Sequence, residues 1–120
     1  MIVRAIILGL QLDLINPTSR PLEFLNKSYD FVPMVPLQLQ NSLDQLHHVK
    51  KIIVGGAKVS LNLRQKLQSK SSVIYETYGM TETITHIAIK KLNHYDPTKR
   101  QSTFSTLPNI AISQDEKGCL

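Results

Sequence analysis

The spacing of apolar residues along the chain predicts short helices and short strands. A helical spacing near the N-terminus predicts a first helix with an apolar face of Ile2, Val3, Ile6, Ile7 and Leu10. Leucines then alternate with polar residues over 10–15, which predicts a strand. Residues 21–26 are expected to form a short helix that carries Leu22 and Leu25 inward, and residues 29–32 a second strand.

The middle of the chain predicts two further helix and strand pairs. A helix that begins at Pro36 has the apolar stripe Leu39, Leu43 and Leu46. The continuous apolar run at 51–54 is typical of a parallel strand buried on both faces. A second helix follows Ser60, which is a good N-cap residue, and its buried residues are Leu63 and Leu67.

The remaining pattern predicts strands at 72–77 and 84–90 and a polar loop at 93–103. Residues 109–113 and those from 118 onward are expected to form the two arms of a hairpin around 115–118. Together these elements predict an α/β fold, a largely parallel sheet with flanking helices plus a small β-hairpin at the C-terminal end. We expect 1–120 to be a single partial domain, because both ends interrupt an element. Its expected parts are an α/β portion over about 1–92, the loop, and the hairpin at 104–120.

Composition narrows the classes of function. The chain has 120 residues, of which 42% are hydrophobic and 19% charged, as in an ordinary globular domain. The net charge is +5, but the basic residues are scattered and their three tight pairs (Lys50–Lys51, Lys90–Lys91 and Lys99–Arg100) are interpreted as solvated strand and loop ends. We therefore expect no nucleic-acid partner. One cysteine excludes an internal disulfide framework, and no apolar run approaches the roughly 20 residues of a membrane span. The expected location is cytoplasmic, with no membrane partner.

Two segments carry candidate chemistry. Gly55, Gly56 and Ala57, here called the glycine turn, follow a buried strand, where the missing Cβ atoms let a ligand approach the backbone. A plain tight turn explains the same residues. Residues 75–83, here called the 75–83 segment, combine aromatic rings, a glycine, hydroxyl groups and a carboxylate.

In the 75–83 segment, the Thr81 hydroxyl suits a phosphate oxygen, and the Glu82 carboxylate is a hard ligand of the kind Mg²⁺ prefers. The alternative is a polar strand end, in which Tyr78 packs and Glu82 is solvated.

Residues 78–83, Tyr-Gly-Met-Thr-Glu-Thr, resemble the adenylate-site signature of the AMP-forming acyl-CoA synthetases. The glycine turn resembles the motif that precedes that signature in the family. Residues 29–40 and 76–87 are most similar to o-succinylbenzoate–CoA ligases of menaquinone biosynthesis. The resemblance implies that ATP activates a carboxylate to an acyl-adenylate, which CoA then captures as a thioester. The implied cofactors are ATP/AMP and Mg²⁺, with CoA as co-substrate.

The resemblance also implies roles for individual residues. The implied catalytic residues are Thr81, which contacts the α-phosphate, and Glu82, which holds Mg²⁺. The implied nucleotide-binding residues are Gly55, Gly56, Ala57, Glu76, Thr77, Tyr78 and Gly79. Thr85 and His86 match positions that border the acyl pocket. Arg4 is a candidate partner for a second carboxylate, because arginine clamps carboxylates with two hydrogen bonds; a plain surface role is its alternative.

Other family parts are absent from the sequence. It has no phosphate loop with its lysine, no later ribose-binding aspartate, and no C-terminal domain with its catalytic lysine. The sequence is therefore interpreted as a middle fragment, the back half of the large N-terminal domain, whose partners are a small carboxylate, a nucleotide and the rest of its own chain. We expect the isolated chain to be inactive and to form a homo-oligomer. The alternative is a non-enzymatic nucleotide-binding or interaction domain.

Overall fold

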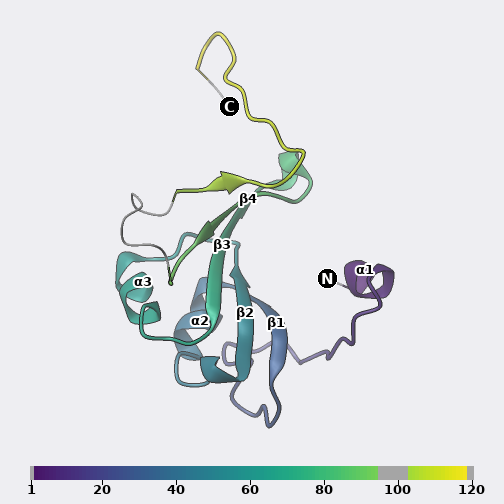
Figure 1. The fold of residues 1–120 in the computed structure, drawn as a ribbon, viewed down its shortest axis with the longest axis vertical. Coiled ribbons are helices and arrows are strands. Elements are labelled where there is room, and N and C mark those ends of the chain that lie inside the picture. Colours follow the sequence, from purple (N-terminus) through teal and green to yellow (C-terminus); the bar gives the residue numbers. More distant parts are fainter. Residues whose placement is uncertain (1, 95–102, 119–120) are drawn as a thin grey trace.

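The computed structural model describes residues 2–94 and 103–118 (Figure 1). In chain order the elements are α1 (Ile2–Ile7), β1 (Tyr29–Met34), α2 (Pro36–Asn41), the 3₁₀ turn η1 (Leu46–His48), β2 (Val49–Val54), α3 (Leu61–Leu67), β3 (Val73–Gly79), the 3₁₀ turn η2 (Thr81–Thr83), β4 (His86–Lys91) and β5 (Ser105–Thr106). In these described residues the five strands form one sheet in the order β1-β2-β3-β4-β5.

The sheet is mixed. β1 pairs with β2 and β2 with β3 in parallel, whereas β3–β4 and β4–β5 are antiparallel. The predicted α/β fold is confirmed, but the prediction of a largely parallel sheet holds only for β1–β3. The reason is the short connection between β3 and β4, residues 80–85, because a parallel return needs a crossover of a dozen or more residues.

The core lies between β1–β3 and the helices α2 and α3, which Figure 1 shows on the same side of these strands. Among these elements, each except β1 contributes at least one fully buried residue to the core. Examples are Leu39 of α2, Ile52 of β2, Leu67 of α3 and Ile74 of β3. The predicted N-cap of α3 is confirmed, since the Ser60 hydroxyl accepts a hydrogen bond from the Leu63 N–H at 3.2 Å.

The N-terminal segment differs from the prediction. Helix α1 forms, but its apolar side chains are exposed and Ala5 is its buried residue. Residues 10–15 have no strand pairing and are exposed, so the predicted strand is wrong; alternation alone does not supply a partner for the backbone groups. Residues 21–24 form turns rather than a helix, although Leu22 is buried as predicted.

The C-terminal segment matches the prediction only in its turn. The Gly118 N–H donates to the Asp115 carbonyl at 3.0 Å, and Gly118 has a φ of +80°. Residues 107–114 pair with no strand, so the first arm of the predicted hairpin does not form. Its second arm falls largely on residues 119–120, and most of the predicted 93–103 loop on 95–102, both outside the described residues. The unpredicted β5 pairs with β4 instead.

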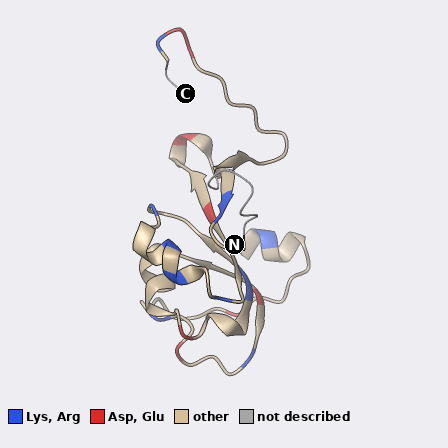
Figure 2. Ribbon diagram, turned by 60° about the vertical axis from the view of Figure 1, so that its left-hand side comes forward, with Lys and Arg blue, Asp and Glu red and all other residues tan. Residues whose placement is uncertain are grey.

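Charged residues of both signs are spread along the described chain (Figure 2). Among the helices that the structure describes, none has both the length and the apolar character needed to cross a membrane.

Candidate nucleotide-binding site

The glycine turn lies where β2 ends and β3 passes close by. The Gly55 N–H donates to the Met34 carbonyl at 3.1 Å, which continues the β1–β2 ladder into the turn. A Cβ on Gly55 would lie 2.6 Å from the Thr77 Oγ1 atom, and Gly56 has a φ of +83°. Glycine at position 55 thus lets Thr77 lie close to the backbone, and position 56 favours glycine for its backbone conformation.

A third glycine allows the chain to fold back after β3. A Cβ on Gly79 would lie 2.5 Å from the Thr85 carbonyl oxygen and 2.8 Å from the His86 Cα atom. The β3–β4 register shifts between Tyr78 and Gly79. Without a side chain at Gly79, the residues that follow Tyr78 return directly against the start of β4, which keeps the 75–83 segment compact.

The turn between β3 and β4 is held by its own hydrogen bonds. The Thr83 Oγ1 atom accepts from the Met80 N–H at 2.9 Å and lies 2.9 Å from the carbonyl oxygens of Met80 and Thr85. The Thr85 N–H donates to the Thr83 carbonyl at 2.7 Å across Ile84, whose φ of +65° is strained for a β-branched residue. This turn presents Thr81 and Glu82 as exposed residues.

The glycine turn and the 75–83 segment border one cavity of about 400 Å³. Its lining residues are Gly56, Ala57, Lys58, Glu76, Thr77, Tyr78, Gly79, Lys90 and Phe104. The predicted nucleotide-binding residues all belong to this lining except Gly55, which lies at the adjoining cavity. The structure thus brings together two motifs that are separated by α3 in the sequence.

The adjoining cavity, about 290 Å³, lies on the other side of the glycine turn and shares Gly56 and Thr77 with the first. His86, one of the predicted acyl-pocket residues, lines it. Arg4 and Thr85, the other two predicted acyl-pocket residues, contact each other. The Arg4 Nη2 atom donates a hydrogen bond to the Thr85 Oγ1 atom at 3.1 Å. The contact joins α1 to the turn before β4, although 81 residues separate the partners.

A buried ion pair borders the cavity of about 400 Å³. Glu76 and Lys90 lie opposite each other in the β3–β4 register, with the Glu76 Oε2 atom 2.6 Å from the Lys90 Nζ atom. Their side chains are only 5% and 12% exposed. The other carboxylate oxygen accepts a hydrogen bond from the Val59 N–H at 2.9 Å, just after the glycine turn. Oε2 has no aligned hydrogen bond within the described residues, so the ion pair alone balances it.

Three residues at this cavity, Lys58, Lys90 and Phe104, were not predicted from the sequence. The Tyr78 and Phe104 ring centroids lie 5.8 Å apart with the rings tilted by 59°, and the Lys90 Nζ atom lies 4.3 Å from the Phe104 centroid. The interpretation of Lys90 as part of a solvated pair is wrong, because an acidic residue faces it across the sheet. The antiparallel register could have signalled this; nothing local signalled Phe104.

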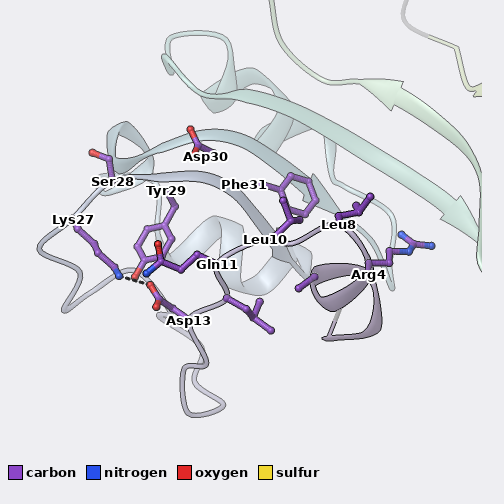
Figure 3. Close-up of a pocket in the computed structure, with 12 residues that line it drawn as sticks. Arg4, Leu8, Leu10, Gln11, Asp13, Lys27, Ser28, Tyr29, Asp30 and Phe31 are labelled. Carbon is purple, nitrogen blue, oxygen red and sulfur yellow. Dashed lines mark ion pairs between the residues drawn. The ribbon is translucent and has the colours of Figure 1, made fainter.

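A third cavity, about 490 Å³, shares no lining residue with the other two and lies between the N-terminal segment and β1 (Figure 3). At one end the Lys27 Nζ atom lies 2.5 Å from the Asp13 Oδ2 atom and 5.3 Å from the Tyr29 ring centroid. The hydrogen bond from Lys27 holds the pKa of the Asp13 carboxyl below its ordinary value. Arg4 lies at the other end and points away from this cluster.

No cluster of three potential metal-ligating side chains occurs in the described ranges. The predicted magnesium residue, Glu82, is an exposed carboxylate in η2. This arrangement still fits Mg²⁺, which is commonly held by one or two protein carboxylates together with phosphate oxygens.

Comparison with known proteins identifies the family of this chain. A family model described as AMP-binding enzyme matches residues 10–118. The chain belongs to this family, as the two motifs predicted.

Particular relatives are similar over part of their length. The 2-succinylbenzoate–CoA ligase of Lactococcus lactis subsp. lactis (strain IL1403) is 32% identical over 94 residues, which cover 76% of this chain and 21% of the relative. A solved structure from Dyadobacter fermentans DSM 18053, an acyl-CoA synthetase (AMP-forming)/AMP-acid ligase II-like protein, is 37% identical with a TM-score of 0.76, over 88% of this chain and 31% of that one. The chain thus spans about a fifth to a third of these proteins' lengths.

Proposed function

We propose that this chain is part of an adenylate-forming acid–thiol ligase, in which ATP activates a carboxylate and CoA accepts the acyl group. The observation that carries the proposal is the shared cavity of about 400 Å³ bordered by the glycine turn and the 75–83 segment. The membership of residues 10–118 in the AMP-binding enzyme family supports it.

In this proposal the adenine lies between the glycine turn and the Tyr78 ring, with Glu76 and Thr77 near its edge. Tyr78 is 42% exposed, so part of its ring is open to a ligand. Thr81 contacts the α-phosphate. Glu82 would hold Mg²⁺, whose charge would offset that of the phosphate oxygens. Because one oxygen of Glu76 is hydrogen-bonded to Val59 and the other is paired with Lys90, its main effect is on the shape of the cavity.

The proposed acid is o-succinylbenzoate, which places the parent enzyme in menaquinone biosynthesis and, by expectation, in the cytoplasm. Similarity to the Lactococcus lactis ligase supports this choice. His86 lines the adjoining cavity, and Arg4 contacts Thr85, so the three proposed acyl-pocket residues are near the turn that follows Tyr78. The Arg4 guanidinium suits a second carboxylate, since it binds carboxylates with two parallel hydrogen bonds.

We further propose that the phosphate loop, the ribose-binding aspartate and the catalytic lysine come from other parts of a longer protein. The isolated chain should then release no pyrophosphate from ATP and o-succinylbenzoate, because no lysine or amide cradle offsets the charge on the leaving phosphates. Turnover by the purified 120-residue chain would contradict this division of the site.

Nucleotide binding by the chain itself is tested by NMR titration with AMP. We expect millimolar AMP to shift the amide signals of the glycine turn and of Tyr78 and Gly79. The amides of β1 and α2, which lie outside the cavity lining, serve as an internal control. Shifts confined to the controls, or none at all, would contradict the proposed site.

A further inference from the structure

We propose that Phe104 is a second aromatic wall of the nucleotide cavity, the cavity bordered by the glycine turn and the 75–83 segment. In this proposal Phe104 contacts the base, and the Glu76–Lys90 ion pair holds its ring in position. This inference rests on the proposed function and assigns a contact that neither motif contains. It makes the cavity selective for a planar purine base.

Phe104 shares the cavity with Tyr78 although it comes from another part of the chain. Tyr78 is on β3, whereas Phe104 precedes β5, which pairs with β4. Both line the cavity of about 400 Å³, with their ring centroids 5.8 Å apart. Tyr78 is 42% exposed and Phe104 is 41% exposed. Because the rings are tilted by 59°, a planar ligand can stack on one ring and contact the other ring edge to face.

Lys90 fixes the position of the Phe104 ring. Its ammonium group lies 4.3 Å from the ring centroid, within the range of a cation–π interaction. The same ammonium lies 2.6 Å from the buried Glu76 carboxylate, which accepts the Val59 N–H. A continuous set of contacts therefore links the backbone after the glycine turn to the Phe104 ring, so both sides of the cavity are set by one ion pair.

The glycine turn, which lines the same cavity, offers backbone rather than bulky side chains, which leaves room for a flat group. Lys58, exposed at the rim of the lining, adds positive charge that favours a phosphorylated ligand. A purine offers more surface for stacking than a pyrimidine, because it has two fused rings. The chemical class that matches the lining is thus a purine nucleotide.

The test is an NMR titration of the 120-residue chain with AMP, with ribose 5-phosphate as the ligand that lacks a base. Stacking should move the ring protons of Phe104 and Tyr78 upfield with AMP and leave them in place with ribose 5-phosphate. Replacing the ring by Phe104→Leu should weaken AMP binding about fivefold or more, whereas Phe104→Tyr should stay within twofold. Phe104→Met is a second ring-free variant.

Phe31→Leu is the matched control, because Phe31 is 40% exposed, on β1, and borders a different cavity. It should leave AMP affinity within twofold. The inference is overturned, with the proposed function intact, if AMP moves the Tyr78 ring but not Phe104 and both ring-free variants bind AMP like the unmodified chain. If AMP does not bind the unmodified chain at millimolar concentration, the proposed function is contradicted and the inference falls with it.

Discussion

The parallel and antiparallel halves of the sheet differ in what surrounds them. β1–β3 pack against α2 and α3 around apolar side chains that are almost completely buried, such as Leu39 and Ile52. Beyond β3, the turn before β4 and the residues next to β5 leave Ile84 93% exposed and Phe104 41% exposed. The difference indicates that folding stability resides mainly in the parallel half.

The antiparallel half is instead organised by polar groups. Glu76 and Lys90 form a buried ion pair across β3 and β4. Asn93, fully buried after β4, accepts from the Ile74 N–H at 3.0 Å and donates to the Ser72 carbonyl at 2.7 Å. Such groups fix geometry more than they add stability. We infer that the first half acts as a scaffold that also carries the glycine turn and Tyr78, and that the second half completes the recognition surface.

The comparison predicts its largest effect for a core residue. Ile52→Ala should lower the free energy of unfolding by about 3–4 kcal/mol, because Ile52 is fully buried and the cavity left behind collapses only in part. Ile84→Ala, the same change in the antiparallel half, should cost less than about 0.5 kcal/mol. Urea denaturation measures both. Equal losses would remove the distinction between scaffold and recognition surface.

A second prediction concerns catalysis in the full-length ligase that we propose. Glu82→Gln keeps the shape of the side chain but removes the charge that a hard cation needs. Adenylation in a single turnover should slow by more than about a hundredfold, roughly 3 kcal/mol, with little change in stability. A rate within threefold of the unmodified enzyme would return Glu82 to the role of a solvated residue.

The ion pair should give a smaller effect with a diagnostic pattern. Lys90→Met leaves the buried Glu76 carboxylate without its partner and should cost about 2–3 kcal/mol of unfolding free energy at neutral pH. Adding Glu76→Gln should recover much of that loss, because no buried charge then remains unpaired. Additive losses in the double variant, measured by thermal and urea unfolding, would show that the two side chains act independently.

The smallest predicted effect concerns backbone strain in the turn before β4. Ile84 has a φ of +65° and is almost fully exposed, so Ile84→Gly relieves strain and loses few contacts. After the entropy cost of glycine, we expect a gain of about 0.5 kcal/mol in unfolding free energy. A clear loss of stability by urea denaturation would mean that the isoleucine side chain has a packing role.

These two halves were also unequally predictable from the sequence. The apolar spacing after Pro36 predicts the burial of Leu39 and Leu46 correctly, although α2 ends at Asn41. The prediction that the strand at 51–54 is buried on both faces holds only in part, because Ile52 and Val54 are buried whereas Ile53 is half-buried. The local motifs likewise predict that the glycine turn and Tyr78 lie at a common site. Apolar spacing did not reveal that α1 would be exposed, since burial depends on a partner that the pattern does not contain.

The contacts of Lys90, Asn93 and Phe104 were not predicted because they depend on the register between strands, which the apolar pattern of a single strand does not contain. β5 has only two residues, Ser105–Thr106, too few for a period to be visible, yet its pairing with β4 places Phe104 beside Tyr78. Similarly, Lys90 is a solvated residue or an ion-pair partner depending only on what lies opposite it.

The central claim, that the glycine turn and Tyr78 enclose a nucleotide base, is tested most directly by a crystal structure of the chain with a non-hydrolysable acyl-adenylate analogue. We predict the adenine between the backbone of residues 55–57 and the Tyr78 ring, with Phe104 alongside. The account would be contradicted if the analogue were bound in the cavity near Asp13 and Lys27 instead. It would also be contradicted if the analogue were bound at any other place in the crystal while the glycine turn stayed empty.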